Sequence, residues 1–257
     1  MSAIVHAGPT PSSTAPPPAA PSRDLALGAV VMVWIAAGLA LDATAGLPMQ
    51  RAIGVATWVL LFALLRGERA AERWQVAAAV AIATAGEYVL SAALHLYEYR
   101  LTNLPAFVPP GHGLVYLAAL ALARSWPAVR HARALVRLSV ALGAAWALWG
   151  VAVAPRPDAL GLLLFLVFAG FAVAGRAPLV YVAAFLLTTY LELVGTAVGS
   201  WTWAARGAGG LLSIGNPPSG VPGVYCVLDA LALASGPAAW RAWERWWRLT
   251  SANASSA

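Results

Sequence analysis

The chain has little charge, no lysine, one cysteine and few histidines, and each shortage excludes a class of protein. Only 10% of its 257 residues are charged, whereas a soluble domain carries about 25%. The absence of lysine excludes a retinal Schiff base, because that linkage requires a lysine amine. The single cysteine, Cys226, cannot form a disulfide within the chain. Four histidines are too few for the histidine clusters of membrane di-iron oxygenases.

What the chain has in abundance is apolar residues, which make up 61% of it. They gather in eight segments, at 25–41, 53–65, 75–96, 112–123, 138–154, 159–174, 178–198 and 221–235. About 20 apolar residues span a bilayer, and the shorter segments extend into apolar or Gly/Ala flanks. We therefore predict an all-α, polytopic integral membrane protein with about eight transmembrane helices, whose partner is the lipid bilayer.

The two ends of the chain differ from this pattern. Residues 1–22 are rich in Pro, Ala, Ser and Thr without apolar periodicity, which is typical of a disordered tail. The apolar run 25–41 has seventeen residues, which is long for a signal peptide, so we expect a retained helix. The stretch 239–257 places three Trp on one helical face and three Arg beside them. This pattern predicts an amphipathic helix that lies in the membrane interface.

The arginines favour one orientation in the membrane. Cytoplasmic loops of membrane proteins are enriched in Lys and Arg. Twelve of the sixteen arginines fall in one alternating set of connecting segments, and four fall in the other. This bias predicts cytoplasmic N- and C-termini in the cell membrane, with the loops 97–111 and 200–220 facing outward. Because the arginines separate apolar segments and do not share one polar face, we expect no nucleic-acid partner.

One stretch of the chain occurs twice, from Glu87 to Tyr116 and from Glu192 to Tyr225. Each copy has a Glu, two aromatic residues separated by one position, two consecutive prolines and a closing Tyr, at nearly equal spacings. Each copy also joins one apolar segment to the next. The chain is therefore expected to consist of two tandem four-helix halves, 23–126 and 127–238. An even number of spans in each half would give both halves the same orientation in the membrane.

Each copy begins with a polar stripe on an otherwise apolar helix. The members of the two stripes are Glu87, Ser91 and His95, and Thr188, Glu192 and Thr196. Residues four apart lie on one helix face. Each Glu precedes its aromatic pair by nine or ten residues, which is about 14–15 Å of helix. A carboxyl at such a depth is costly to place in lipid, so we expect it to face the bundle interior.

Two interpretations of these carboxyls remain open. Glu87 and Glu192 can be neutral packing residues that hydrogen-bond one helix to another, or acid/base groups and ligands for a polar substrate group. Asp229, four residues after Tyr225, has the same two interpretations. The presence of a Glu in both copies of the stretch favours the interpretation as acid/base groups or ligands. The predicted catalytic residues are Glu192, Glu87 and Asp229, supported by Ser91, His95, Thr188 and Thr196.

Aromatic and polar residues of the two loops form the predicted substrate-binding layer. They are Tyr97, Tyr99, Arg100, Asn103, His112 and Tyr116 in the first copy, and Trp201, Trp203, Asn216 and Tyr225 in the second. Aromatic residues at a membrane edge are also common as belt residues, and His112 is equally compatible with a helix cap. No metal-ligand spacing and no nucleotide-binding loop is present, so we expect neither a metal nor a cofactor.

Part of the second copy resembles a known family. The residues that carry the resemblance are Glu192, Gly195, Gly199, Trp201, Trp203 and Gly220-Val221-Pro222. Their order is similar to a motif of the polytopic carotenoid hydratases of the bisanhydrobacterioruberin hydratase type. The resemblance covers the stretch 192–222 alone. It implies acid-assisted addition of water to an isoprenoid double bond, with Glu192 as the acid.

Three functions are compatible with these patterns. The first is an intramembrane enzyme that acts on a lipid or isoprenoid by acid/base chemistry at an outward-facing site. The second is a transporter or lipid carrier whose carboxyls couple to protons. The third is a non-catalytic membrane subunit in which the repeated motif only packs helices. A cavity reachable from both faces would favour transport, and one closed to the cytoplasm would favour an enzyme or an outward-facing binder. The most useful observation is whether Glu87, Glu192 and Asp229 converge on one cavity. Ligand identity and oligomeric state stay open.

Overall fold

The structure is a computed structural model that describes residues 21–235 and residue 241. Apart from one two-stranded sheet, the described regular structure is helical. Within these residues, five helices are long and apolar enough to cross a membrane: Arg23–Asp42, Leu47–Leu65, Ala70–Ala93, Ala132–Ala152 and Pro178–Ala197. The chain is thus all-α with five candidate membrane-spanning helices among the described residues. The predicted interfacial helix at 239–257 lies outside the described residues, apart from residue 241. Residues 21 and 22, which the prediction placed in the tail, belong to a helix that begins at Pro21.

In each half of the chain, three long helices are followed by a short strand and a further helix. The first has α1 (Pro21–Asp42), α2 (Leu47–Leu65), α3 (Ala70–Glu87), the π-helix η1 (Tyr88–Ala93), β1 (Tyr97–Tyr99) and α4 (Val108–Arg124). After the short α5 (Trp126–Arg130), the second has α6 (Ala132–Ala152), α7 (Ala159–Ala174), α8 (Pro178–Ala197), β2 (Trp201–Trp203), the 3-10 turn η2 (Ala208–Gly210) and a last helix, Pro222–Ser235. Each of the eight predicted apolar segments therefore falls on a helix of the structure.

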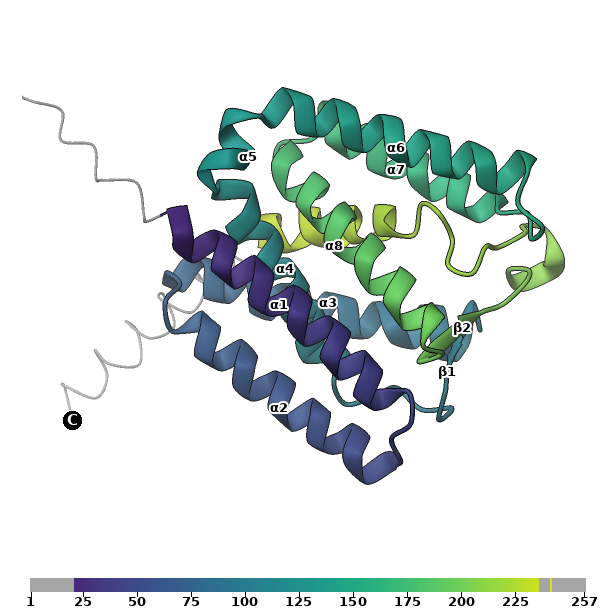
Figure 1. The fold of residues 1–257 in the computed structure, drawn as a ribbon, viewed down its shortest axis with the longest axis horizontal. Helices are drawn as coiled ribbons and strands as arrows, with labels where there is room; N and C mark the ends of the chain where they lie inside the picture. The colour runs from purple at the N-terminus through teal and green to yellow at the C-terminus, as the bar shows by residue number, and fades with distance from the viewer. Residues whose placement is uncertain (1–20, 236–240, 242–257) are drawn as a thin grey trace, which may run out of the picture.

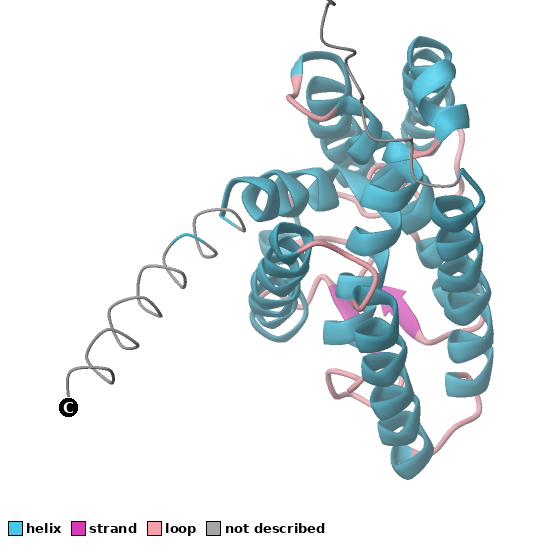
Figure 2. Cartoon of the chain, turned by 90° about the vertical axis from the view of Figure 1, so that its left-hand side faces the viewer, coloured by secondary structure: helices cyan, strands magenta, loops and turns pink. Residues whose placement is uncertain are grey.

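The two copies of the repeated stretch meet in an antiparallel two-stranded sheet at one end of the bundle (Figure 1), drawn in magenta in Figure 2. In each strand the outer two residues are buried and the middle one is exposed. Because side chains alternate along a strand, the four aromatic rings point into the bundle, while Glu98 and Thr202 point away. These strands replace parts of the predicted loops. So short a sheet depends on cross-strand packing, which the rings of Tyr97 and Trp203 provide at 4.6 Å between centroids.

Helix α4 lies at the centre of the bundle, against α1, α2, α3 and α8. Residues 114–119 in it are at most 2% exposed. Small residues in a helix allow the neighbouring helices to pack close to its backbone. A Cβ atom at Gly113 would overlap the side chains of Leu61 in α2 and Val80 in α3. The close packing carries His112, near the start of α4, into the interior of the bundle, where it is buried.

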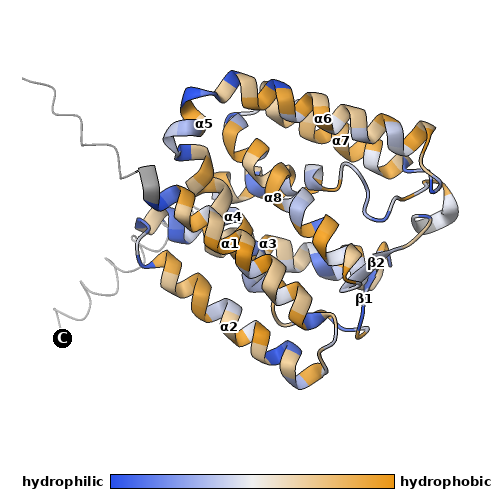
Figure 3. Ribbon diagram, in the orientation of Figure 1, coloured by the Kyte–Doolittle hydropathy of each residue, from blue (hydrophilic) through white to orange (hydrophobic). Residues whose placement is uncertain are grey.

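The end of the bundle away from the sheet is held together by a cluster of charged side chains. Arg124, at the end of α4, donates hydrogen bonds to Asp24 in α1 at 2.9 Å and to Glu68 at 2.7 Å. Arg23 donates to the same Glu68 at 3.0 Å. Figure 3 shows hydrophobic residues along the helices and hydrophilic residues gathered at their ends. The cluster ties α1 and α4 to the connection between α2 and α3 at this end of the bundle.

Candidate functional site

Two glutamates, one from each copy of the repeated stretch, lie beneath the sheet. Glu87 ends α3 and is 8% exposed, and Glu192 lies in α8 and is 5% exposed. Oε2 of Glu87 accepts hydrogen bonds from the hydroxyls of Tyr97 at 2.6 Å and Tyr99 at 2.9 Å. Oε2 of Glu192 accepts from the indole N–H groups of both tryptophans of β2, each at 3.0 Å. In both copies, two aromatic donors of one strand therefore converge on one carboxyl oxygen.

Two glycines allow the second copy to adopt this geometry. A Cβ atom at Gly195 would overlap the ring of Trp201, so only glycine lets the indole lie against α8 and reach Glu192. Gly199 has a φ of +74°, a left-handed conformation that turns the chain from α8 into β2. In the first copy, η1 and His95, whose φ is +48°, make the corresponding turn. The sequence spacing that marked the motif is thus the spacing that brings each ring back to its glutamate.

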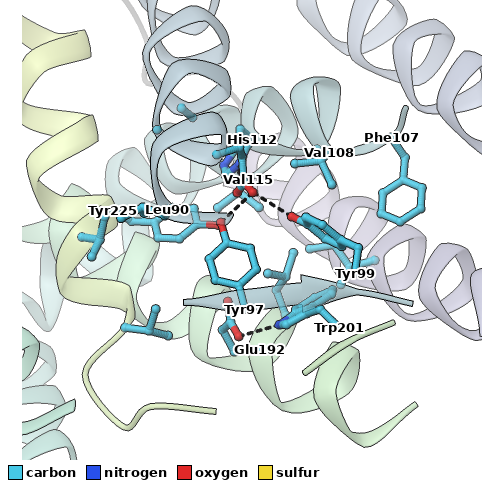
Figure 4. A pocket seen from close by; sticks show the side chains of 18 of the residues that line it. Leu90, Tyr97, Tyr99, Phe107, Val108, His112, Val115, Glu192, Trp201 and Tyr225 are labelled. Carbon is cyan, nitrogen blue, oxygen red and sulfur yellow. Dashed lines mark hydrogen bonds and ion pairs between the residues drawn. The ribbon is translucent and has the colours of Figure 1, made fainter. Parts of the chain in front are cut away.

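The hydrogen bonding of the two carboxyls differs in one respect. Nε2 of His112 lies 3.0 Å from Oε1 of Glu87, so both oxygens of Glu87 have partners. Within the described residues, Oε1 of Glu192 has no hydrogen-bond partner. Figure 4 shows Trp201 directed at Glu192, and the two tyrosines of β1 directed at the oxygens beside His112. Glu192 is therefore held in place through one oxygen and presents the other.

The tyrosines of β1 act as donors because they keep their protons. Burial, followed by the neighbouring Glu87 carboxyl, raises the pKa of Tyr97 and of Tyr99 above the ordinary value for a phenol. A protonated phenol can donate to a carboxyl oxygen and also presents an uncharged ring face to the interior. The first copy therefore offers two hydroxyl donors where the second offers two indole donors.

Both glutamates line one cavity of about 430 Å³. The predicted site residues that line it are Glu87, Tyr97, Tyr99, His112, Glu192, Trp201, Trp203 and Tyr225. Most of the remaining wall is apolar and comes from α1, α2, α3, α4, α7 and the last helix. A volume of this size lies in the range of small-molecule sites, about 300–1,000 Å³. The cavity can therefore take a small molecule or one end of a longer apolar one.

The cavity occupies only the half of the bundle next to the sheet. From α1 it is lined by residues between 34 and 39, from α4 by residues no later than 115, and from α8 by Leu191 and Glu192 alone. It therefore does not extend to the charged cluster around Arg124. One of its lining residues, Val89 in η1, is 52% exposed. The wall of the cavity along η1 therefore borders the exposed side surface of the bundle.

Nine predicted residues do not line the cavity, and four of them lie in α4, α8 and the last helix. Tyr116 is buried and donates to Oε1 of Gln75 at 3.3 Å, and Thr196 donates to the backbone of its own helix at 2.7 Å. Asp229 and Thr188 are buried, and among the described residues Oδ2 of the first and Oγ1 of the second have no partner. None of the four lines the cavity. The cavity thus brings together two of the three predicted acids, without Asp229.

Three predicted substrate-binding residues make contacts that hold the sheet in place. Arg100 donates to backbone carbonyls at and just after the end of α1. Nδ2 of Asn103 donates to Oε1 of Gln50 at 2.9 Å. Oδ1 of Asn216 accepts from the backbone N–H of Trp203 at 2.9 Å. Since none of the three lines the apolar cavity, their contacts position the strands that carry the aromatic donors.

Sequence reasoning missed two residues on which this arrangement depends. Asp158 caps α7 by accepting from the backbone N–H of Gly161 at 3.0 Å, and it also accepts from the backbone of Gly215 and Ser219 at 2.8 and 2.7 Å. Arg156 donates to the backbone carbonyl of Ile214 at 2.6 Å and to two carbonyls at the end of β2. An Asp directly before an apolar run is a helix-start signal. That signal could have identified the cap, but not the contacts with a loop more than fifty residues away.

Comparison of the chain with protein-family models, with curated proteins and with solved structures gives no match. Among the described residues, no group of three or more His, Cys, Asp or Glu is placed to hold a metal ion. The function is therefore argued from the geometry and chemistry of the cavity.

Proposed function

We propose that the protein is an intramembrane acid/base enzyme that acts on an apolar lipid or isoprenoid. The observation that carries the proposal is that Glu87 and Glu192, from the two copies of one motif, line the same apolar cavity. Carboxyl groups inside a membrane bundle are costly and commonly mark functional sites. Aromatic donors hold both of these carboxyls in place, which is the preorganisation that a catalytic group requires.

The walls of the cavity favour an apolar substrate with a reactive double bond. Leucine and valine side chains and aromatic rings form most of the surface, and the polar groups are concentrated around the two carboxyls. Aromatic ring faces stabilise cations, and so does a nearby carboxylate. Such a site suits a reaction that passes through a carbocation. A substrate dissolved in the bilayer would enter sideways along η1, where Val89 is exposed.

The proposed reaction is the addition of water to an isoprenoid double bond, as the resemblance of the stretch 192–222 implies. A carboxylic acid donates its proton to one alkene carbon, and the π electrons form the new C–H bond. The other carbon becomes a tertiary cation, to which the oxygen of a water molecule bonds. That water then loses a proton, which restores the acid. The balance is one alkene and one water to one alcohol, with no oxidation or reduction.

The two glutamates are suited to different parts of this reaction. The resemblance makes Glu192 the acid, but the hydrogen bonds favour Glu87 for proton transfer, because His112 at 3.0 Å can pass it a proton. Glu192 is fixed by two indoles and presents its free Oε1, so it suits stabilisation of the cation. We assign these roles as part of the proposal.

The proposal includes a membrane arrangement. It has eight crossings in two tandem halves of like orientation, with both termini cytoplasmic and the sheet at the outer face. Three observations support it: the shared order of long helices and strand in the halves, the pairing of the two copies in one sheet, and the distribution of the arginines. The site would then open toward the outer leaflet.

Two alternatives are less well supported. A transporter needs a path through the bundle, whereas this cavity occupies one half of it and does not extend to the Arg124 cluster at the other end. A packing role would explain the aromatic hydrogen bonds. It gives no reason for a cavity beside the unpartnered Oε1 of Glu192.

The proposal is tested by expression in a host that makes isoprenoid pigments. Extracts of cells with the wild type, with Glu192→Gln and with an empty vector are compared by chromatography and mass spectrometry. We expect a product heavier by one water with the wild type alone, because Gln cannot carry the charge that stabilises the cation. Identical profiles in all three cultures would refute the proposal.

Filling the cavity is expected to abolish product without loss of stability. Gly111 lines the cavity in α4, and a Cβ atom added there would meet open space. Gly111→Leu therefore places a side chain in the cavity, and the helix gains up to about 1 kcal/mol from better propensity. Gly170→Leu is the matched control, since Gly170 also faces open space but lies in α7 outside the cavity wall. Product from Gly111→Leu at the level of Gly170→Leu would contradict a substrate in this cavity.

A further inference from the structure

A second cavity, of about 730 Å³, lies beside the sheet and is lined by polar side chains. We call it the vestibule. The polar residues that distinguish its wall are Ser91, His95, Glu98, Thr102, Asn103 and Thr202. They come from η1, from the turn between η1 and β1, from both strands and from the turn after β1. The vestibule therefore lies at the sheet end of the bundle, where the chain leaves its apolar helices.

The vestibule and the apolar cavity share a wall. Glu87, Tyr97, Tyr99 and Trp203 line both cavities. The aromatic residues of the sheet and Glu87 thus form a partition between the apolar cavity and a cavity with several polar side chains. Glu192 lines the apolar cavity only. The two glutamates, equivalent in sequence, therefore differ in the spaces that they reach.

The polar residues of the vestibule run from the surface to Glu87. His95, Glu98 and Thr202 are exposed, Ser91 is half-buried, and Glu87 is buried. Ser91 lies one turn from Glu87 along the helix and donates to the backbone carbonyl of Tyr97 at 3.2 Å. The lining of the vestibule therefore includes exposed, half-buried and buried polar residues.

Asn103 gives an independent indication of bound water. Its amide oxygen is buried and has no hydrogen-bond partner within the described part of the chain. Its amide nitrogen is already used, on Gln50. Buried acceptors in native structures are satisfied by protein groups or by ordered water. A water molecule in the vestibule would supply the missing donor.

We propose that the vestibule is the aqueous entry to the site, through which Glu87 exchanges protons and water with the outer phase. The use of this entry rests on the proposed function, whereas its existence does not. Glu87 gives its proton to the substrate in the apolar cavity, and the proton that the added water loses returns to Glu87 by way of the water in the vestibule. The proton thus arrives on one side of the aromatic partition and the substrate on the other. Glu192, which the vestibule does not reach, keeps its charge-stabilising role.

Cysteine labelling tests the entry directly. Single cysteines replace Ser91 in the vestibule, Leu164 in the apolar cavity and Thr202 at the mouth, in a Cys226→Ala background. The full-length protein is placed in nanodiscs so that reagents reach both faces. We expect Ser91→Cys to react with a cationic methanethiosulfonate at least ~10-fold faster than Leu164→Cys. With a lipid-soluble maleimide, Ser91→Cys and Leu164→Cys should react at similar rates, because this reagent reaches the apolar cavity as well.

The labelling result overturns the entry if Ser91→Cys reacts no faster than Leu164→Cys while Thr202→Cys reacts readily. If Cys226→Ala fails to fold, the wild-type Cys226 can stay, because it is fully buried. Labelled Ser91→Cys should also lose at least ~10-fold in turnover relative to the unlabelled protein, since the reagent plugs the route to the acid. Unchanged turnover after complete labelling would overturn the role of the entry.

Different combinations of results would overturn the proposed aqueous entry and the proposed acid. Rapid labelling of Ser91→Cys together with full turnover in Glu87→Gln would overturn the proposed acid and leave the aqueous entry in place. No labelling of Ser91→Cys together with loss of turnover in Glu87→Gln would overturn the entry and support the enzyme.

Discussion

Changing Glu87 to Gln is expected to lower turnover by about 10²–10⁴-fold, the range that a positioned acid/base group contributes. The amide keeps the shape of the side chain, and its oxygen can still accept from Tyr97 and Tyr99. It cannot donate a proton to a substrate or take one from His112. The fold should therefore survive while the chemistry is lost. Product formed per unit of purified protein measures the effect, and thermal unfolding in detergent confirms the fold.

Glu72→Gln is the matched control for this variant. Glu72 lies in the same helix, fifteen residues before Glu87, or about 22 Å along the axis. Its carboxyl is paired with Arg69 at the opposite end of the bundle. We expect it to retain wild-type turnover. If Glu87→Gln and Glu72→Gln are equally active, the carboxyl beneath the sheet is a packing group and the proposed mechanism fails.

Removing the Asp158 side chain is expected to destabilise the protein by about 3–5 kcal/mol. Its two oxygens accept four hydrogen bonds, from three backbone N–H groups and the hydroxyl of Ser219. Each buried donor left without a partner costs about 1–3 kcal/mol, and relaxation of the loop recovers part of the total. The loop also carries Asn216, which holds β2. Asp158→Ala should therefore lower the melting temperature in detergent by about 10 °C.

Two controls calibrate the Asp158 result. Asp158→Asn keeps one acceptor oxygen and should lose about half as much stability. Glu98→Ala removes an exposed carboxyl from the middle of β1 and should stay within about 0.5 kcal/mol of the wild type. A melting temperature for Asp158→Ala equal to that of Glu98→Ala would show that these four hydrogen bonds do not hold the loop.

The helices and the motif of this protein could be predicted from local sequence. A long apolar run in lipid can hydrogen-bond its backbone N–H and C=O groups within the segment only as a helix, so each run predicted a helix. The spacing from each Glu to its aromatic pair also identified the cavity residues, because the chain returns over one hairpin within ten or twelve residues. These are short-range relations. A single sequence shows them without any knowledge of packing.

The sheet and its supports could not be predicted in this way. Strands of three residues have no periodicity to detect, and β1 pairs with a strand about one hundred residues later. Arg100 and Asn103 looked like ligands for a substrate because polar residues near a membrane edge often are. Their partners, at the end of α1 and in α2, became visible only when the helices were packed.

The sequence by itself determined that this chain forms apolar helices long enough to cross a membrane and that it carries one glutamate motif twice. Only the tertiary structure decided that the two glutamates are unequal. Glu87 lies in the partition between the apolar cavity and the vestibule and meets His112, whereas Glu192 faces the apolar cavity alone. The physical reason is that access to water and to a proton partner depends on the loops and helices that pack around a carboxyl. Two identical side chains in similar local sequence thereby acquire different chemistry.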